Sequence, residues 1–389
     1  MSNARNLSKF KPSSSGLVET TDIADDAVTG AKVENNPTIA GNLTVSGGFI
    51  PSATTAGKNM IVNGAMRIHQ RADTLTNTPK AVDRFQLVKN NLDTANFSER
   101  HYVAGEAEVR EFGGDSLEIK CTTADTNIGS AELIHIRHQM EAQFLRRLAW
   151  GTANAKTTTL SFSVYSNVTG TYAVVFQTVD GTARNISATY TISSANTWER
   201  KTITIVGDTG ATIDNDNGLG LEISWILSAG SNYTSSNPNG AWANKSDTRF
   251  AFGHNVNIAS AVNNVFYLTG VQWEEGSVAT PFEQESPDLT LIKCLRYFYK
   301  PNTEDNFMGS LMAPDGNAND FIGAINFPVQ MRSQPAYTGT PVENGSADTL
   351  GGQTSVDTNR ACLSFVRMTN DGNAARRGLN IRGVVSAEF

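Results

Sequence analysis

The chain is predicted to be mainly all-β, with a β-sandwich in its middle, a short helix after it and a second β domain at its end. Short segments that alternate apolar and polar residues follow one another at intervals of roughly 8–20 residues. Turn signals such as Gly113–Gly114 and Asn217–Gly218 separate them. Apolar and charged residues make up only 39% and 18% of the chain, and 33 glycines suit a protein with many exposed turns.

The composition sets limits on size, partners and compartment. A chain of 389 residues has room for two or three domains. Its formal net charge of −7 disfavours a nucleic-acid phosphate surface as a partner. Neither a signal-peptide core nor a long apolar run is present, so we expect synthesis in a reducing cytoplasm and no membrane span. The spacing of Cys121, Cys294 and Cys362 suits reduced thiols better than disulfides or metal ligands.

Residues 1–58 hold too few apolar side chains to build a core of their own. Ile39, Leu43 and Val45 alternate with polar residues and indicate one isolated strand. A lone strand cannot bury its apolar face, whereas several copies of the chain wound together can. The sequence therefore leaves two interpretations open, a disordered tail or a segment ordered by self-association.

Residues 59–285 are predicted to form the β-sandwich. Asn63–Gly64 is a strong hairpin signal at its start. One helix, Met140–Trp150, interrupts the strands, with Phe144, Leu145 and Leu148 on its buried face. The strands after the start are expected at Ser116–Lys120, Ala131–Ile136, Thr158–Tyr165, Tyr172–Thr178, Ser187–Ile192, Trp198–Val206, Gly220–Leu227, Ala251–His254 and Val265–Trp273.

Residues 286–389 are predicted to be a linking helix followed by a C-terminal β domain. Ser286 offers an N-cap oxygen, Pro287 suits the first helical position, and Asp288 suits the positive end of the helix dipole. The helix is expected to continue to Tyr299, with one face formed by Leu289, Ile292, Arg296 and Tyr299. Strands are expected at Phe307–Met312, Phe321–Phe327, Ala361–Met368 and Leu379–Glu388.

The sequence holds no catalytic motif of weight, and we predict that the chain is not an enzyme. It has no phosphate-binding loop, no nucleophile elbow and no HExxH metal motif. His135 and His138 have the spacing of helical metal ligands, but a strand over this stretch places them on opposite faces. Paired acids such as Glu274–Glu275 leave glycoside hydrolysis as an alternative.

Ligand binding has better support, and two candidate sites stand out. Tyr233 and Trp242, with Trp225 close by, lie in or near loops rich in Asn, Ser and Gly, where aromatic rings can stack on sugar faces. Trp225 lies in the apolar run LEISWIL, which favours a core residue over a sugar contact. Asp214 and Asp216 have the alternating oxygens of a calcium loop, although the downstream glutamate of that pattern is missing. A structural calcium ion is therefore possible, and no other cofactor is expected.

Three blocks of the sequence resemble segments of bacteriophage tail fibres. Residues 59–88, beginning NMIVNGAMRIHQR, are similar to the opening of a jelly-roll module related to carbohydrate-binding modules. Residues 270–299 contain QWEEGSVATPFE and CLRYFY, and residues 327–337 read FPVQMRSQPAY. The phrases DIADDAVTGAKV and NPTIAGNLTVSGG resemble attachment and neck segments. Their order along the chain is the order found in a fibre.

The resemblance implies a homotrimeric virion protein made in the host cytoplasm. Its residues 1–58 would attach to the phage tail or an adaptor protein, residues 59–285 would form the jelly roll, and residues 286–389 would face the host. Its receptor would be a cell-surface polysaccharide. Two alternatives stay open: a purely structural virion component, such as a head fibre, decoration or collar protein, and a polysaccharide depolymerase.

Overall fold

The computed structural model describes residues 57–71, 74–76, 80–103, 112–236, 240–300, 310–311, 321–343, 354–367 and 379–389. The predicted attachment segment, residues 1–58, lies almost wholly outside the described residues. Contacts between residues place 50–389 in one unit, so the sandwich and the C-terminal sheets are described together.

Two six-stranded antiparallel sheets form the sandwich, and we name them sheet A and sheet B. Sheet A has the order β1 (Thr74–Thr76), β3 (Asn96–Val103), β4 (Asp115–Thr123), β12 (Val265–Glu275), β6 (Thr158–Ser166) and β9 (Glu199–Ile205). Sheet B has the order β11 (Ala243–Asn244), β8 (Arg184–Ile192), β7 (Gly170–Thr178), β10 (Leu219–Ala229), β5 (Leu133–Glu141) and β2 (Phe85–Asn90).

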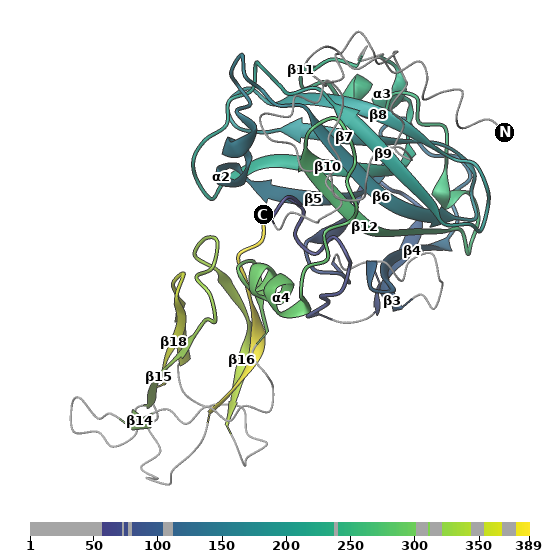
Figure 1. Cartoon of the computed structure of the whole chain (residues 1–389). Coiled ribbons are helices and arrows are strands. Elements are labelled where there is room, and N and C mark those ends of the chain that lie inside the picture. Colours follow the sequence, from purple (N-terminus) through teal and green to yellow (C-terminus); the bar gives the residue numbers. More distant parts are fainter. Residues whose placement is uncertain are drawn as a thin grey trace, which may run out of the picture. The chain divides into compact units, whose positions relative to one another are not determined.

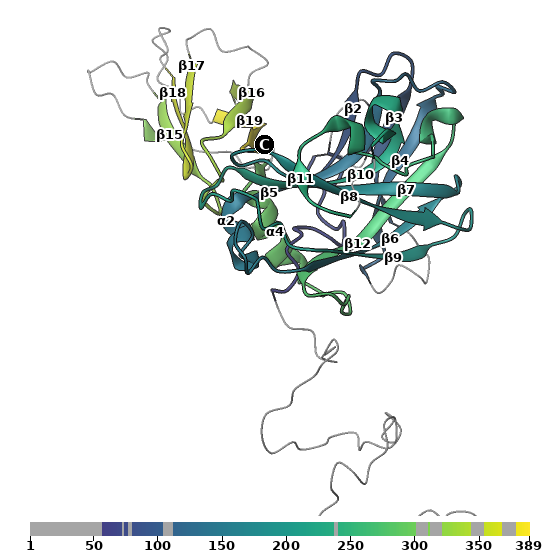
Figure 2. The same cartoon turned by 90° about the horizontal axis from the view of Figure 1, so that it is seen from above.

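The chain crosses repeatedly from one sheet to the other. It passes from β4 in sheet A to β5 in sheet B, back to β6, on to β7 and β8, and back again to β9. This alternation is the jelly-roll form of a β-sandwich, and Figures 1 and 2 show the two sheets facing each other. The predicted fold class is confirmed.

The core lies between the sheets and is rich in aromatic rings. Along β12, Phe266, Leu268 and Trp273 are fully buried. In sheet B, Trp225 is also fully buried, and its ring centroid lies 5.9 Å from that of Phe162 in sheet A. Because successive side chains of a strand point to opposite faces, Tyr267, between Phe266 and Leu268, points away from the core, whereas Val271 after the bulge returns to it.

A bulge in β12 depends on a glycine. The pairing of β12 with β6 shifts between Thr269 and Gln272, and Gly270 there has a φ of +58°. A Cβ atom at Gly270 would lie 2.7 Å from the ring of Phe112, so a side chain would be strained and would also clash. Phe112 therefore packs closely over the bulge on the face of sheet A that points away from the core.

The predicted helix Met140–Trp150 is much shorter in the structure. Strand β5 continues to Glu141, and only α2 (Ala142–Leu145) and the 3₁₀ turn η4 (Arg146–Leu148) follow it. Leu145 and Leu148 are buried as expected, but Phe144 is 45% exposed. The other short helical turns of the sandwich are α3 (Ser231–Thr234), η5 (Asp247–Arg249) and η6 (Ile258–Ser260).

Helix α4 (Pro287–Leu295) begins as predicted but ends four residues early. The side chain of Ser286 accepts a hydrogen bond from the main-chain nitrogen of Leu289, which confirms the N-cap. The face that holds Leu289 and Ile292 is not the buried one: these side chains are 46% and 48% exposed, while Thr290, Cys294 and Leu295 are buried. The last predicted turn instead forms β13 (Phe298–Tyr299), which pairs with the final strand of the chain.

Two small antiparallel sheets make up the C-terminal region. The first has the order β13, β19 (Leu379–Ser386) and β16 (Ala336–Glu343). The second has the order β14 (Ser310–Leu311), β15 (Phe321–Asn326), β18 (Cys362–Arg367) and β17 (Thr354–Thr358). These strands agree with the predicted C-terminal β structure, and β16 and β17 are additions to it.

Two local predictions in the sandwich are wrong. Asn63–Gly64 lies in a turn, with Asn63 at a φ of +63°, but no strands flank it to make a hairpin. Residues 251–254 also form turns rather than a strand.

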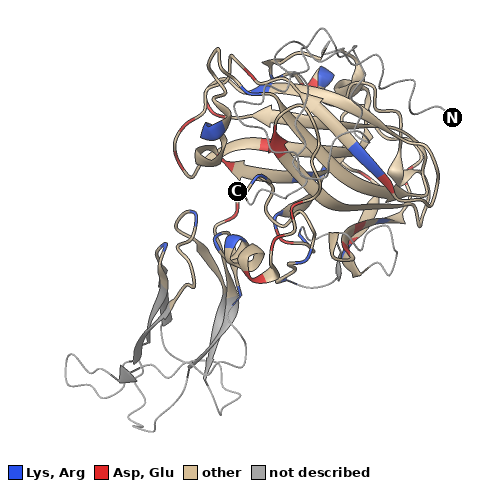
Figure 3. Cartoon of the chain, in the orientation of Figure 1, with Lys and Arg blue, Asp and Glu red and all other residues tan. Residues whose placement is uncertain are grey.

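In the described chain no helix is long and apolar enough to span a membrane. Acidic and basic residues are interspersed along the ribbon drawn in Figure 3.

Three histidines are enclosed in the sandwich, and their burial affects stability. Burial lowers the pKa of His135 and His138 to about 3 and that of His254 to about 4. On one face of β5, Nδ1 of His135 lies 3.0 Å from Oγ of Ser224. On the opposite face of the same strand, the ring of His138 packs against the ring of Phe85. The opposite faces predicted for this pair are confirmed.

We expect the free energy of unfolding to fall as the pH is lowered from 7 to 5. The unfolded chain takes up protons at these histidines below about pH 6.5, whereas the folded chain does not. By pH 5 this difference lowers the free energy of unfolding by roughly 2 kcal/mol per histidine. Buried Glu99 and Asp83 oppose this, since burial raises the pKa of both carboxyl groups, that of Glu99 to about 7, and the folded state keeps their protons longer. Three histidines outweigh these two carboxyl groups. Urea unfolding at both pH values measures the loss, His254→Gln should reduce it, and equal midpoints would contradict it.

Candidate functional site

Four half-buried aromatic side chains form a continuous row on the outer face of sheet A, where Tyr102 and Trp198 also pack on buried Phe112. We call this group the aromatic row: Tyr102 of β3, Tyr267 of β12, Tyr165 of β6, and Trp198 immediately before β9. In β12 and β6 the ring is presented through the same alternation that buries the neighbouring residues. Tyr267 lies between buried Phe266 and Leu268, and Val164 and Ser166 beside Tyr165 are buried.

The rings of the aromatic row touch one another in sequence. The Tyr102 and Tyr267 centroids are 5.4 Å apart, those of Tyr267 and Tyr165 are 5.3 Å apart, and those of Tyr165 and Trp198 are 5.6 Å apart. Trp198 also lies 6.1 Å from Tyr267, so the rings form a compact cluster although their residues come from β3, β12, β6 and the segment before β9. Clustered aromatic rings that stay partly accessible on the outer face of a sheet are candidates for a binding surface.

A buried carboxylate fixes one end of the row. Tyr267 donates a hydrogen bond from Oη to Oε2 of Glu118 at 2.5 Å, and Arg100 contacts both oxygens of the same carboxylate at 3.1 and 2.6 Å. The guanidinium of Arg100 also lies over the Tyr102 ring, 4.7 Å from its centroid. Glu118 is only 4% exposed, so this network holds two rings in place while Arg100 stays accessible.

The rest of the surroundings are polar. Tyr165 donates to Oδ1 of Asn196 at 3.4 Å, and Arg200 donates to the hydroxyl of Ser161 at 2.8 Å and to the main-chain oxygen of Gly270 at 2.6 Å. Phe112 and Phe282 pack edge to face beside the row, with centroids 5.2 Å apart. Apolar ring surface next to fixed donors and acceptors is the chemistry that a pyranose requires, because its C–H face is apolar and its rim carries hydroxyl groups.

The structure separates the aromatic residues that the sequence pointed to. Trp225 is fully buried in the core, so its role as a sugar contact is wrong and its interpretation as a core residue is correct. Tyr233 packs toward Phe250 and donates to the oxygen of Ala131 at 3.2 Å. Trp242 packs edge to face on Trp150 and donates to the oxygen of Val206 at 2.8 Å. Tyr233 and Trp242 are half-buried and belong to different apolar clusters, so they do not form one surface.

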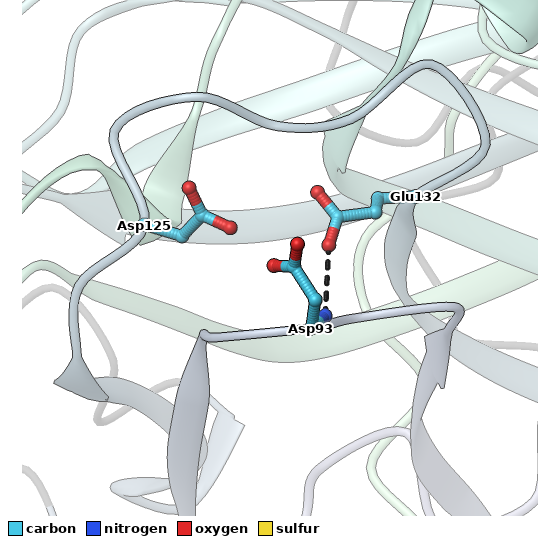
Figure 4. Close-up of side chains that lie close together, drawn as sticks. All are labelled: Asp93, Asp125 and Glu132. Carbon is cyan, nitrogen blue, oxygen red and sulfur yellow. Dashed lines mark hydrogen bonds between the residues drawn. The ribbon is translucent and has the colours of Figure 1, made fainter.

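The two residues that the sequence pointed to as calcium ligands do not belong to the cluster of carboxylates that the structure brings together. Asp214 and Asp216 are exposed, and Oδ1 of Asp216 accepts from the nitrogen of Gly218 at 2.8 Å, as expected for a turn. Among the described residues, three carboxylates that could bind a hard cation converge instead at Asp93, Asp125 and Glu132, with ligand atoms within 4.8 Å of one another (Figure 4). Calcium binding remains an expectation, and this cluster is where oxygen ligands gather.

The sequence carried a signal for the aromatic row that composition alone does not reveal. Tyr165 follows buried Val164 in a stretch where apolar and polar residues alternate, and Tyr267 lies between buried Phe266 and Leu268, so each is directed to the other face of its strand. What the sequence does not reveal is that β3, β12 and β6 belong to the same sheet. Residues 102, 165 and 267 become neighbours only through that topology.

Comparison with protein-family models and with curated proteins found no match. Among solved structures, one described as "CBM4 structure and function" is 13% identical, with a TM-score of 0.29, covering 56% of this chain and 99% of that one. The enzymatically active domain of bacteriophage CBA120 tailspike protein 4 is 12% identical, with a TM-score of 0.31, covering 56% of this chain and 22% of the tailspike.

A family 11 carbohydrate-binding module from Clostridium thermocellum, in complex with a mixed-linked tetrasaccharide, is 10% identical with a TM-score of 0.26. It covers 53% of this chain and 97% of that chain. At these TM-scores the likenesses decide neither fold nor function, which rest on the strands and side chains described above.

Replacing Glu118 with Gln should lower the pKa of Tyr267. Burial and the adjacent Glu118 carboxylate both raise that pKa, and the substitution removes the negative charge while keeping a side chain of the same size. Spectrophotometric titration of tyrosinate measures the shift. The absorbance change that is missing in the Tyr267→Phe variant identifies the ionisation of the Tyr267 hydroxyl. An unchanged titration in the Glu118→Gln variant would show that the carboxylate does not control the ring.

Proposed function

We propose that this chain is a non-catalytic bacteriophage tail-fibre protein that binds a host-surface polysaccharide through the aromatic row. The observation that carries the sugar-binding part is the row itself: the half-buried rings of Tyr102, Tyr267, Tyr165 and Trp198 contact one another on the outer face of sheet A. Polar groups that are already hydrogen-bonded surround the rings, so a sugar would meet a preformed surface. The fibre part rests on the resemblance of residues 59–88, 270–299 and 327–337 to fibre segments.

In this proposal the virion carries the protein on its tail, with residues 1–58 attached to tail or adaptor proteins. The rival structural role in a head fibre, decoration or collar requires no sugar contact. The rival role as a depolymerase requires two carboxylates flanking a bound glycosidic bond. Glu118 is engaged by Arg100 and Tyr267, which favours a positioning function for it over acid–base chemistry.

We also propose that the fibre is a homotrimer, with α2 and α4 at the contact between copies. Phe144 of α2 and Leu289 and Ile292 of α4 are exposed apolar side chains. Both helices line one cavity of about 410 Å³, together with Gly57. Because residues 1–56 are joined to the sandwich at Gly57, copies associated through that segment would be brought together near this face.

Trp198→Ala and Tyr165→Ala should each weaken binding to isolated host polysaccharide at least about tenfold, since aromatic anchors dominate such contacts. Titration calorimetry measures the affinity, and near-ultraviolet circular dichroism checks that each variant is folded. The matched control is Tyr233→Ala, a half-buried tyrosine on a different cluster, which should bind like the parent protein.

Three outcomes would contradict this proposal. Loss of binding in the Tyr233→Ala variant alone would move the site to α3, and absence of binding by the parent protein would favour the structural rival. Release of reducing sugars from the polysaccharide would favour the depolymerase.

Sedimentation should give three times the monomer mass for the parent protein and a lower mass for Leu289→Asp/Ile292→Asp, because two buried carboxylates would oppose association. Val262→Asp serves as a matched control, since Val262 is 51% exposed on a turn before β12. A trimer that persists in the α4 variant, or a monomeric parent protein, would contradict the proposed contact.

A further inference from the structure

The penultimate residue of the chain is held by three cations that come from the start of the sandwich. Glu388 contacts Nη2 of Arg71 at 3.0 Å, Nζ of Lys80 at 2.9 Å and Nη1 of Arg84 at 2.5 Å. The side chains of Lys80, Arg84 and Glu388 are 9%, 2% and 10% exposed. More than 300 residues separate the partners along the chain, so this is a tertiary contact and not a local turn.

The main chain around Glu388 is secured as firmly as its side chain. Arg332 donates to the oxygens of Ala387 and Glu388 at 2.7 and 3.0 Å, and also to the oxygen of Asn217 in the sandwich at 2.9 Å. The nitrogen of Ala387 donates to the oxygen of Tyr297 at 2.8 Å. Arg332 also lies over the ring of Phe389, 4.0 Å from its centroid.

The cationic residues are held in costly conformations. Lys80 and Arg84 are not glycines, yet they have φ angles of +81° and +73°. A left-handed backbone at such residues costs on the order of 1–3 kcal/mol and persists only where surrounding contacts impose it. The three positive charges gathered here, with Asp83 in contact with Arg71, would repel one another more strongly without the carboxylate of Glu388.

The carboxylate of Glu388 is suited to balancing these positive charges because it stays ionised. Burial would raise the pKa of Glu388, but Arg84, Lys80 and Arg71 lower it to about 2, so the group is ionised at any physiological pH. Aromatic rings also cover two of the cations that Glu388 contacts. The guanidinium carbon of Arg84 lies 3.4 Å from the centroid of the Tyr297 ring, and that of Arg71 lies 3.7 Å from the centroid of the Phe298 ring. Tyr297 lies between α4 and β13, and Phe298 is the first residue of β13.

We infer that Glu388 and Phe389 form a carboxyl-terminal latch that fastens the C-terminal sheets to the sandwich. Strand β19 ends at Ser386, so the latch acts directly on the strand that pairs with both β13 and β16. With the latch closed, the C-terminal sheets and the sandwich unfold together. With it open, β13 and β19 lose their tie to residues 71–84, and the C-terminal sheets unfold separately. This inference does not depend on sugar binding or on the fibre role.

The test uses the full chain and compares Glu388→Gln with a matched control, Glu275→Gln, which removes an exposed ion pair with Lys156. Hydrogen exchange should accelerate at least about tenfold at residues 297–299 and 384–387 in Glu388→Gln, with the sandwich strands unchanged. Calorimetry should resolve a second, earlier transition. Glu388→Asp, which keeps the charge on a shorter side chain, should fall between the parent protein and Glu388→Gln.

A chain that ends at Ala387 provides the second variant in case Glu388→Gln does not fold. It should keep the sandwich transition while the C-terminal sheets unfold earlier. The latch is overturned if both variants behave like Glu275→Gln. It is also overturned if the shortened chain loses the sandwich transition, because Glu388 would then be part of the sandwich fold itself.

Discussion

The structure depends on the burial of one face of each sheet against the other. Strand β12 lies at the centre of sheet A, and its residues Phe266, Leu268 and Trp273 fill the core between the sheets. The same alternation turns Tyr267 outward, because a strand cannot bury one side without presenting the other. The aromatic row is thus a consequence of core packing combined with the choice of aromatic residues at the outward positions.

Much of the fold could be predicted, because alternation and turn residues are local signals. The strands around Tyr165 and Tyr267, the cap at Ser286 and the opposite faces of His135 and His138 follow from nearby residues. The short helices could not be predicted well. Leu289 and Ile292 share a face at helical spacing, but Cys294 and Leu295 compete for the buried side, and tertiary packing selects the latter.

The candidate site was harder to predict than the fold. Aromatic residues in polar loops drew attention to Tyr233 and Trp242, whose N–H and O–H groups are used to fasten loops to main-chain oxygens. The residues of the aromatic row lie in strands far apart in sequence, and only the strand order of sheet A brings them together. The contact of Glu388 with Arg84 likewise has no local signal, since it joins the two ends of the described chain.

Sugar binding on the outer face of sheet A is the central claim, and hydrogen exchange in the presence of host polysaccharide tests it most directly. The account predicts slower exchange in peptides that cover Tyr102, residues 163–167, residues 193–200 and residues 265–269, with little change elsewhere. Protection confined to residues 231–244 or to the C-terminal sheets, with the aromatic row unaffected, would contradict it.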